Sequence, residues 1–403
     1  PASARPAEHM AVNSTIRLAI FTTHPIQYQC PLWRRLNDLR GIRPRVFFLS
    51  DFSARTYHDK EFGRSVEWTV PLLEGYDFEV FGHDRPASSF AVGPSTLARQ
   101  FRAFAPHACL INGYVPLFYW HALAACRLGG VPAILRTEAT DAANHRSLLR
   151  ATARTLALRC FYAQISHFLA IGHNARSHYL RLGVSPKRIG FSPYCVDSDL
   201  FERQRQAAVR GPLRRALGIP EDAVALLFSG KLIPKKDPGL VLDALKTVRE
   251  VAGKPIHAVF MGDGELRAEL EQRAAGEGSG RFHFLGFRNQ EQMGEVYANC
   301  DLLVLPSRYS ETWGLVVNEC LQFGLPAIVS DRVGCGPDLI EEGLTGAIFP
   351  AGDASSLRQR ILSMVGTLLA NKSGVFAACR AKATAYSLDR AVDGIADAVH
   401  SVT

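Results

Sequence analysis

Short apolar segments alternate along this chain with segments whose apolar residues recur at helical spacing. In the first half the short segments are residues 16–21, 45–49, 78–81, 109–111, 133–135 and 168–171. Residues 31–39 and 116–128, which lie between them, carry apolar side chains three or four positions apart. Because buried parallel strands read as short apolar runs, the alternation predicts a parallel sheet with helical crossovers.

A second series of the same kind follows, with short apolar segments at residues 223–228, 258–261, 282–285, 302–305, 327–329 and 347–349. Two series predict an α/β fold of two Rossmann-like, doubly wound domains that face each other across a cleft. We place the domains at residues 14–196 and 221–380, joined by a polar, Arg-rich linker at 197–220. Residues 1–13 are small and polar, and we expect a disordered leader.

The composition is that of an ordinary globular protein, since 47% of the 403 residues are hydrophobic and 21% are charged. No apolar run approaches the roughly 20 residues of a transmembrane helix, so we expect no membrane span. The nine cysteines are scattered, without C-x-x-C pairs or metal-ligand spacing. We therefore expect reduced thiols, no metal site and a cytoplasmic location.

The net charge of +8 is concentrated in the first half of the chain. Residues 1–195 hold 23 Lys and Arg against 12 Asp and Glu, whereas the remaining residues hold 23 against 26. A basic half favours either an anionic ligand or solubility alone. Arg146, Arg150 and Arg154, four positions apart, form a helix face that is either solvated or rests on anionic lipid at the inner membrane face. Aromatic residues do not alternate with these arginines, so we expect no nucleic-acid partner.

Glycine and lysine follow the predicted strands of the second half. Ligands of doubly wound sheets bind at the carboxyl ends of the strands. Gly230 would let the backbone approach a ligand, and Lys231 and Lys236 offer ammonium groups suited to a diphosphate. Gly262, Gly264 and Phe287 follow the next two strands. One glycine usually marks only a turn, but its recurrence along one predicted edge indicates a binding site.

Two carboxylates, Glu311 and Glu319, flank the predicted strand-to-helix junction after residues 302–305. With Thr312 or Ser310 as N-cap, a helix beginning near residue 313 would present free N–H groups to a phosphate or a sugar hydroxyl. The alternative is structural: Glu311 as a first-turn acid, and Glu319 as an edge residue paired with a basic neighbour.

These segments resemble the nucleotide-sugar domain of retaining glycosyltransferases of the GT-B fold, family 4. Residues 230–236 resemble the family's G-R-L-x-x-x-K, 262–264 its G-x-G, 284–286 its F-L-G, and 306–319 its P-S-x-x-E-x-x-G-x-x-x-x-E, with the following G-x-P at 324–326. Residues 196–201 resemble the G-V-D-x-x-x-F that closes the acceptor domain. By the same resemblance, residues 381–403 contain a C-terminal helix that crosses back to the first domain.

The resemblance implies metal-independent transfer of a sugar, with retention, from a nucleoside diphosphate sugar, UDP favoured over GDP. Glu319 would bind the ribose hydroxyls, and Lys236 with Lys231 would neutralise the leaving diphosphate. Glu311 would orient the donor sugar. The remaining donor residues that the resemblance implies are Gly230, Gly262, Gly264, Phe287, Thr312, Trp313, Gly314 and Leu315. Since Lys231 stands where the family usually has Arg, a bidentate fork becomes a point charge.

The first domain departs from the family pattern, and its residues are candidates for the acceptor. The loop after residues 16–21 is not glycine-rich; it carries His24, Gln27 and Tyr28. Glu138, where many members have His, would assist at the anomeric centre or bind the acceptor. His24 and Asn174 are acceptor candidates whose alternative role is helix capping. Our catalytic candidates are therefore Glu311, Lys236, Lys231, Glu138 and His24, and one expected acceptor class is anionic: a lipid-linked sugar, a glycan or a small molecule.

Two other functions use the same residues. A nucleotide-sugar epimerase of this fold needs acid and base groups for the sugar ring but no acceptor pocket. A non-catalytic module would bind the nucleotide sugar without turnover, although it has less need of Glu311, Glu319 and both lysines. The apparent D-x-D at 197–199 is not interpreted as a metal site, because it follows no buried strand of the second domain.

Overall fold

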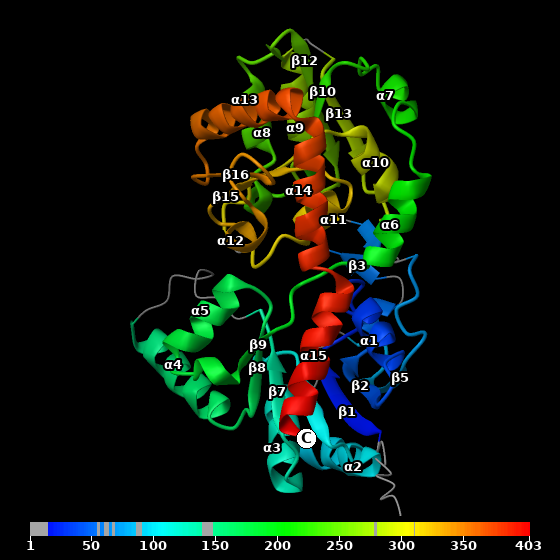
Figure 1. The fold of residues 1–403 in the computed structure, drawn as a ribbon, viewed down its shortest axis with the longest axis vertical. Helices are drawn as coiled ribbons and strands as arrows, with labels where there is room; N and C mark the ends of the chain where they lie inside the picture. Colours follow the sequence, from blue (N-terminus) through cyan, green and yellow to red (C-terminus); the bar gives the residue numbers. More distant parts are fainter. Residues whose placement is uncertain are drawn as a thin grey trace, which may run out of the picture.

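The computed structural model describes residues 15–54, 57–59, 64–66, 69–85, 91–138, 148–277, 280–309 and 311–403. Two α/β domains lie one above the other along the longest axis, with the second domain uppermost in Figure 1. Each is built on one sheet, and a small antiparallel pair, β3 (Tyr57–Asp59) and β4 (Arg64–Val66), stands apart from both sheets. The predicted fold class is confirmed.

The first sheet has seven parallel strands in the order β5-β2-β1-β6-β7-β8-β9. They are β1 (Ile16–Thr22), β2 (Ile42–Ser50), β5 (Asp77–Gly82), β6 (Ala108–Ile111), β7 (Ala133–Arg136), β8 (His167–Ala170) and β9 (Ile189–Phe191). Every residue of β6 and β7 is buried, as expected for central strands covered on both faces. All six predicted strands of the first half are present.

The described first half of the chain contributes five helices to this domain: α1 (Cys30–Asn37), α2 (Pro94–Phe104), α3 (Leu117–Gly129), α4 (Leu148–Tyr162) and α5 (His173–Arg181). Short 3-10 turns lie at Phe52–Ala54 and Pro186–Arg188. Helix α1 buries Leu32, Trp33 and Leu36 on one face, while its two arginines are half-buried and Asn37 is exposed, which is the amphipathic pattern that predicted it.

The second sheet has parallel strands in the order β13-β12-β10-β14-β15-β16, and β11 pairs antiparallel with β12. Its strands are β10 (Val224–Ser229), β11 (Glu250–Val251), β12 (Lys254–Met261), β13 (Phe282–Gly286), β14 (Leu302–Leu305), β15 (Ala327–Ser330) and β16 (Gly346–Phe349). The parallel strands of this sheet therefore follow the order 3-2-1-4-5-6 of the dinucleotide-binding fold, and the first sheet has the same order with β9 added beside β8.

The helices of the second half are α6 (Ser198–Ala207), α7 (Pro212–Ala216), α8 (Gly239–Leu245), α9 (Arg267–Gly276), α10 (Met293–Asn299), α11 (Leu315–Gln322), α12 (Gly336–Leu339), α13 (Ala354–Ala370), α14 (Lys372–Ala385) and α15 (Leu388–Val402). Short 3-10 turns lie at Pro234–Lys236 and Gln290–Gln292. The segment 197–220, which we expected to be a linker, instead folds as α6 and α7 and packs on α10 and α11. Phe201 explains the difference, because its fully buried ring lies 6.3 Å from Tyr297 and 6.5 Å from Phe323.

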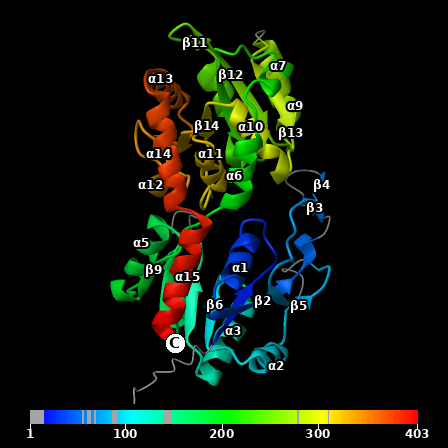
Figure 2. The same cartoon turned by 45° about the vertical axis from the view of Figure 1, so that its right-hand side comes forward.

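The C-terminal helices connect the two domains. Helix α14 packs on α11 of the second domain, whereas α15 lies against α1, β8 and β9 of the first, as both views show (Figures 1 and 2). Gly394 permits this contact, since a Cβ there would meet the Phe191 carbonyl oxygen at 1.9 Å. Residues 354–402 are long and apolar enough for a membrane span by length and composition. In the structure they form three separate helices, broken at Asn371 and at 386–387, each with a buried face on a domain.

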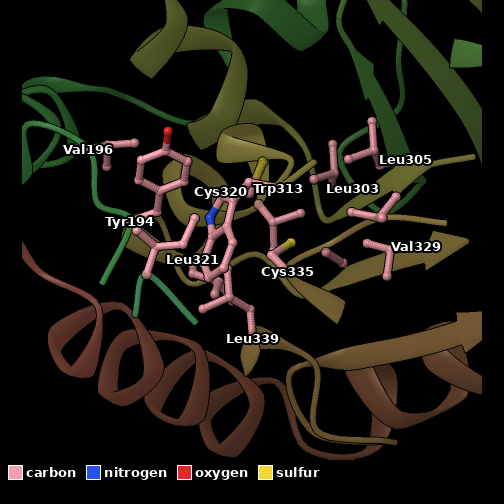
Figure 3. Close-up of a cluster of buried hydrophobic side chains, with 14 of the residues drawn as sticks. Tyr194, Val196, Leu303, Leu305, Trp313, Cys320, Leu321, Val329, Cys335 and Leu339 are labelled. Atoms are coloured by element: carbon pink, nitrogen blue, oxygen red, sulfur yellow. The ribbon is translucent and has the colours of Figure 1, made fainter. Parts of the chain in front are cut away.

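The apolar core of the second domain continues into the domain junction, as the cluster drawn in Figure 3 shows. Tyr194, in the connection between the domains, packs edge-on against Trp313 with ring centroids 5.6 Å apart. Trp313 Nε1 donates to Asn318 Oδ1 (2.8 Å), and Asn318 Nδ2 donates to the Tyr194 carbonyl oxygen (3.2 Å). This packing fixes the loop before α11 against the first domain.

Candidate functional site

Each sheet has a switch point where the strand order reverses, between β1 and β6 in the first domain and between β10 and β14 in the second. Ligands of doubly wound sheets bind in the crevice at such points. A cavity lies at the carboxyl ends of the strands in each domain, and Tyr28 lines both cavities. The two cavities therefore meet at this side chain.

The second-domain cavity measures about 220 Å³. It is lined by residues that follow β10, β12 and β13, by α10 and α11, and by two residues of the first domain: Ser229, Gly230, Met261, Gly262, Phe287, Arg288, Gln290, Met293, Leu315 and Glu319, with Gln27 and Tyr28. Four of the predicted donor residues, Gly230, Gly262, Phe287 and Leu315, thus lie together with Glu319. Gln27, predicted to bind the acceptor, lines this cavity and not the one in the first domain.

Gly262 and Gly264 hold the loops of this cavity together. Both have φ near +150°, a conformation that side chains rarely adopt. A Cβ at Gly262 would lie 1.9 Å from the Gly230 carbonyl oxygen, and one at Gly264 would lie 2.6 Å from that of Leu232. These two glycines are therefore required where the loop after β12 packs on the loop after β10.

Glu319 lies on α11 with its carboxyl group at the cavity, where it accepts a hydrogen bond from the Tyr297 hydroxyl. Burial raises the pKa of Glu319 to about 7, an effect that the Tyr297 hydrogen bond partly offsets. No basic neighbour pairs with it among the described ion pairs, so the edge-residue alternative finds no support. A carboxylate whose pKa is raised at the wall of a cavity is typical of a functional site.

Glu311 and Lys236 form a partly buried ion pair in the cleft. Ser307, which follows β14, donates to the same carboxylate oxygen over 3.0 Å. Lys236 ends the short 3-10 turn after β10, so the pair joins the loops on both sides of the switch point. Lys231 lies in the same loop after β10 and is half-buried.

The entrance to α11 differs from the prediction. The helix begins at Leu315, and Gly314, with φ of 98°, occupies the N-cap position without a side-chain cap. Thr312 is not the N-cap, because its hydroxyl donates to Glu138, and Ser310 lies outside the described residues. The first N–H groups of the helix have no partner within the helix. The Trp313 side chain is buried in the domain junction, so only its backbone is available to a ligand.

The first-domain cavity measures about 310 Å³. Its lining residues follow β1, β6, β7 and β8 or lie on adjoining loops: Thr22, Thr23, Ile26, Tyr28, Gln29, Asn112, Gly113, Tyr114, Val115, Pro116, Tyr119, Arg136, Thr137, Glu138, Ile171 and Tyr194. Gly113 brings the β6 loop against Tyr119, since a Cβ there would lie 2.5 Å from the tyrosine ring.

Glu138 is the hydrogen-bonding centre between the domains. Its Oε1 accepts from the Tyr194 hydroxyl and, over 3.4 Å, from that of Tyr28, while its Oε2 accepts from Thr312 Oγ1 over 2.8 Å. The neighbouring Arg136 is 3% exposed and donates to Ser192 and to the Pro193 carbonyl oxygen. Its guanidinium group therefore holds the domain connection.

Two predicted acceptor residues lie outside both cavities. His24 packs on Phe52 with ring centroids 5.0 Å apart, and burial lowers its pKa to about 4, so the ring is neutral at pH 7. It does not cap α1, whose N-cap is Gln29. Asn174 neither caps α5 nor lines either of the two cavities described; its Nδ2 donates to the Gly334 carbonyl oxygen (3.0 Å) across the domain interface.

Other sequence hypotheses concern charged residues. Arg154 donates to the Tyr114 hydroxyl (3.0 Å), while Arg146 and the Arg150 side chain lie outside what the structure describes. Asp197 caps α6 through Leu200 N (3.0 Å), and Asp199 pairs with Arg35 (2.9 Å), so both D-x-D carboxylates have structural partners. Among the described residues, no three His, Cys, Asp or Glu side chains are grouped to hold a metal ion.

Sequence reasoning missed several lining residues. Asn112 directly follows β6, and the strand-end rule that identified Gly230 would have found it. Its Nδ2 and Oδ1 are both buried and without a hydrogen-bond partner. Gln290 Oε1 and Arg288 Nε in the second-domain cavity are also buried and unpartnered. Tyr297 had no local signal, because its contact with Glu319 spans 22 residues.

Residues 209–366 match the family model described as "Glycosyl transferases group 1". The chain is 33% identical over 229 residues to a D-inositol 3-phosphate glycosyltransferase of Geodermatophilus obscurus, covering 54% of this chain and 48% of that protein. It is 31% identical over 154 residues to an alpha-D-kanosaminyltransferase of Streptomyces kanamyceticus, covering 38% and 39%. The chain thus spans about half, or less, of the length of these curated relatives.

Solved structures match nearly the whole chain at low sequence identity. The structure of Anabaena HepE in complex with UDP has a TM-score of 0.69 at 17% identity, covering 96% of this chain and all of that one. A glycosyltransferase of Rickettsia africae has a TM-score of 0.71 at 12% identity, covering 96% and 98%. The chain has the GT-B fold.

Proposed function

We propose that this protein is a glycosyltransferase that moves a sugar, with retention and without a metal ion, from a nucleoside diphosphate sugar to an acceptor on the first domain. One observation carries the proposal: two cavities at the switch points of two facing sheets meet at Tyr28, and Glu138 bonds to Thr312 beside that meeting point. A donor in one cavity and an acceptor in the other would place their reacting groups between the domains.

The second-domain cavity would bind the donor nucleotide. The Glu319 carboxylate lies at the cavity wall and would accept hydrogen bonds from the ribose hydroxyls. The hydrogen bond from Tyr297 holds this carboxylate in place. Gln290 Oε1 and Arg288 Nε, which are buried and unpartnered, would contact the base. UDP is the first choice of nucleotide, since HepE, which shares this fold, is described in complex with UDP.

The ion pair and the start of α11 would act on the reacting part of the donor. The bond between the anomeric carbon and the diphosphate breaks, an acceptor hydroxyl oxygen bonds to that carbon, and the hydroxyl proton passes to an oxygen of the leaving diphosphate. Negative charge then accumulates on the leaving diphosphate. Lys236, with Lys231 and the N–H groups at Leu315, would neutralise that charge, while Glu311 and Thr312 would orient the sugar.

Two alternative functions, an epimerase and a binding module, are distinguished by the test below. An epimerase would have no use for the polar first-domain cavity, and a binding module would have no use for the ion pair of Lys236 and Glu311. The names of the relatives do not identify the acceptor of this chain, although one relative is named for a phosphorylated polyol, D-inositol 3-phosphate.

The test is a thermal-shift panel of UDP-, GDP- and ADP-sugars, followed by mass spectrometry of products formed from the best donor. We expect a glycosylated acceptor whose anomeric configuration, measured by NMR, equals that of the donor. An altered nucleotide sugar formed without an acceptor would indicate an epimerase. Binding without any turnover would indicate a module.

A further inference from the structure

The first-domain cavity carries a recognition group that the structure leaves unused. Both amide atoms of Asn112, Nδ2 and Oδ1, are buried and have no hydrogen-bond partner. Buried polar groups are nearly always paired, so such an exception calls for an explanation. The residue lies at the carboxyl end of β6, beside the switch point of the sheet, where ligands of this fold bind.

The chemistry of this amide matches hydroxyl groups. A carboxamide offers two donors and one acceptor, and a hydroxyl group both donates and accepts. A sugar or another polyol presents neighbouring hydroxyls, which can satisfy both ends of the amide at once. Thr22, Thr23 and Tyr28 line the same cavity, but their hydroxyl groups already bond to Gln29, His24 and Glu138, which leaves Asn112 as the side chain with both ends open.

The described wall of the cavity holds one carboxylate and one guanidinium, so it offers no excess positive charge to an anionic ligand. Glu138 places a carboxylate on its wall. Of the described lining residues, Arg136 is the only Lys or Arg, and its Nε and Nη2 already donate to Ser192 and Pro193. Arg154 bonds to the Tyr114 hydroxyl and is not part of the lining. A phosphate here would face a carboxylate without a lysine or an uncommitted arginine on the described wall.

We infer that the acceptor is a neutral polyol, most simply an uncharged sugar, and that Asn112 binds a pair of its hydroxyls. The inference rests on the proposed function and adds the class of acceptor. It replaces the anionic acceptor that the basic first half of the chain suggested. Several of those arginines are engaged elsewhere, as Arg45 is with Asp77 (2.7 Å) and Arg35 with Asp199.

The first experiment uses matched acceptors. Methyl glycosides of common hexoses and their 6-phosphates, together with inositol and its 3-phosphate, are offered with the best nucleotide sugar, and kcat/KM is measured for each pair. We expect transfer to at least one neutral acceptor, at least tenfold more efficient than to its phosphorylated partner. Preference for the phosphorylated member, or transfer to no neutral member, overturns the inference.

A measurement without acceptor distinguishes a failure of this inference from a failure of the proposed function. Donor binding and slow donor hydrolysis by water are measured without any acceptor. If the protein binds and cleaves the donor but glycosylates only phosphorylated acceptors, the proposed function stands and the acceptor class is wrong. If no nucleotide sugar is bound or cleaved, the proposed function itself fails.

The second experiment tests Asn112. Asn112→Ala is expected to raise the acceptor KM by about 10-fold or more, while donor KM and thermal stability stay near wild type, because the lost amide makes no bond within the protein. Asn37→Ala, at an exposed position that ends α1, is the matched control. An unchanged acceptor KM in a folded Asn112→Ala protein that still binds UDP would show that Asn112 does not bind the acceptor.

Discussion

The Thr312 hydroxyl of the second domain donates a hydrogen bond of 2.8 Å to Glu138 Oε2 of the first. Two tyrosines of the first domain, Tyr28 and Tyr194, donate to the other oxygen of the same carboxylate. Glu138 is therefore bonded to both sides of the cleft beside the point where the two cavities meet. Any motion that opens the cleft at this point would break the bond to Thr312.

The bond between Thr312 and Glu138 predicts energetic coupling of the two side chains. In a double-mutant cycle of Thr312→Val and Glu138→Gln, we expect a coupling free energy of about 1–2 kcal/mol in kcat/KM for transfer, because a hydrogen bond to a charged group contributes about 1.5–3 kcal/mol. Thr312→Val combined with Glu221→Gln, at an exposed distant position, should be additive. Additive effects in the first pair as well would show that the contact has no role in turnover.

Glu319 predicts a pH dependence of donor affinity. Its pKa of about 7 means that the carboxyl group is mostly protonated at pH 6 and mostly ionised at pH 8. Only the ionised form accepts hydrogen bonds from both ribose hydroxyls with full strength. We expect the Kd of UDP-glucose, measured by calorimetry, to fall by up to about tenfold between pH 6 and 8.

The matched variants identify the titrating group. Glu319→Gln should bind the donor more weakly at pH 8 and show a flat profile, whereas Glu295→Gln, exposed on α10, should keep the wild-type profile. A profile that persists in Glu319→Gln would assign the titration to another group.

The same raised pKa predicts an opposite trend for folding. Because the folded protein holds the Glu319 proton more tightly than the unfolded chain does, the stability contributed by that proton is present below about pH 4.5 and is lost as the pH rises through 7. In the absence of ligand, Glu319→Gln should therefore gain Tm relative to wild type between pH 5 and 8. A difference in Tm that does not change with pH would contradict this assignment.

Replacing Lys236 is expected to lower turnover. Lys236→Met removes the ammonium group that we propose neutralises the diphosphate, and it leaves Glu311 without its ion-pair partner. We expect kcat to fall by about 100- to 1,000-fold, as when one stabilising donor of a transition state is removed. Lys246→Met, at an exposed position after α8, should leave kcat unchanged. A steady-state assay with saturating donor and acceptor measures kcat, and a value near wild type would remove Lys236 from the mechanism.

Glycine at position 262 is expected to be required for the folding of the donor site. Gly262→Ala would place a Cβ 1.9 Å from the Gly230 carbonyl oxygen at a positive φ, so we expect a loss of about 2 kcal/mol or more in the free energy of unfolding, and weaker donor binding. Gly276→Ala is the control, since a Cβ there meets nothing within 4 Å and α9 gains helix propensity. Urea denaturation compares the two, and equal stabilities would contradict the close approach.

The sequence by itself determined the two domains and much of the second-domain cavity. Local apolar runs specify strands such as β10 and β14. The loops that follow β10 and β12 need positive φ angles, and glycine at positions 230 and 262 meets that need. Glu319 was identified because the flanking pattern is contiguous along the chain. Periodicity and turn chemistry act over a few residues, so they can be interpreted without knowing the packing.

The tertiary structure alone decided which residues face each other across the cleft. Glu138 and Thr312 are 174 positions apart, and they meet only because the two domains are docked. Asn174 was expected in the site, but docking places its side chain against Gly334. Docking also buries the Trp313 side chain at the junction, which leaves the predicted contact of its backbone N–H with the donor untested. Asn112 was identified as a binding group only because its buried amide atoms have no hydrogen-bond partner in the packed domain. Such contacts depend on long-range packing, which no local pattern in the chain encodes.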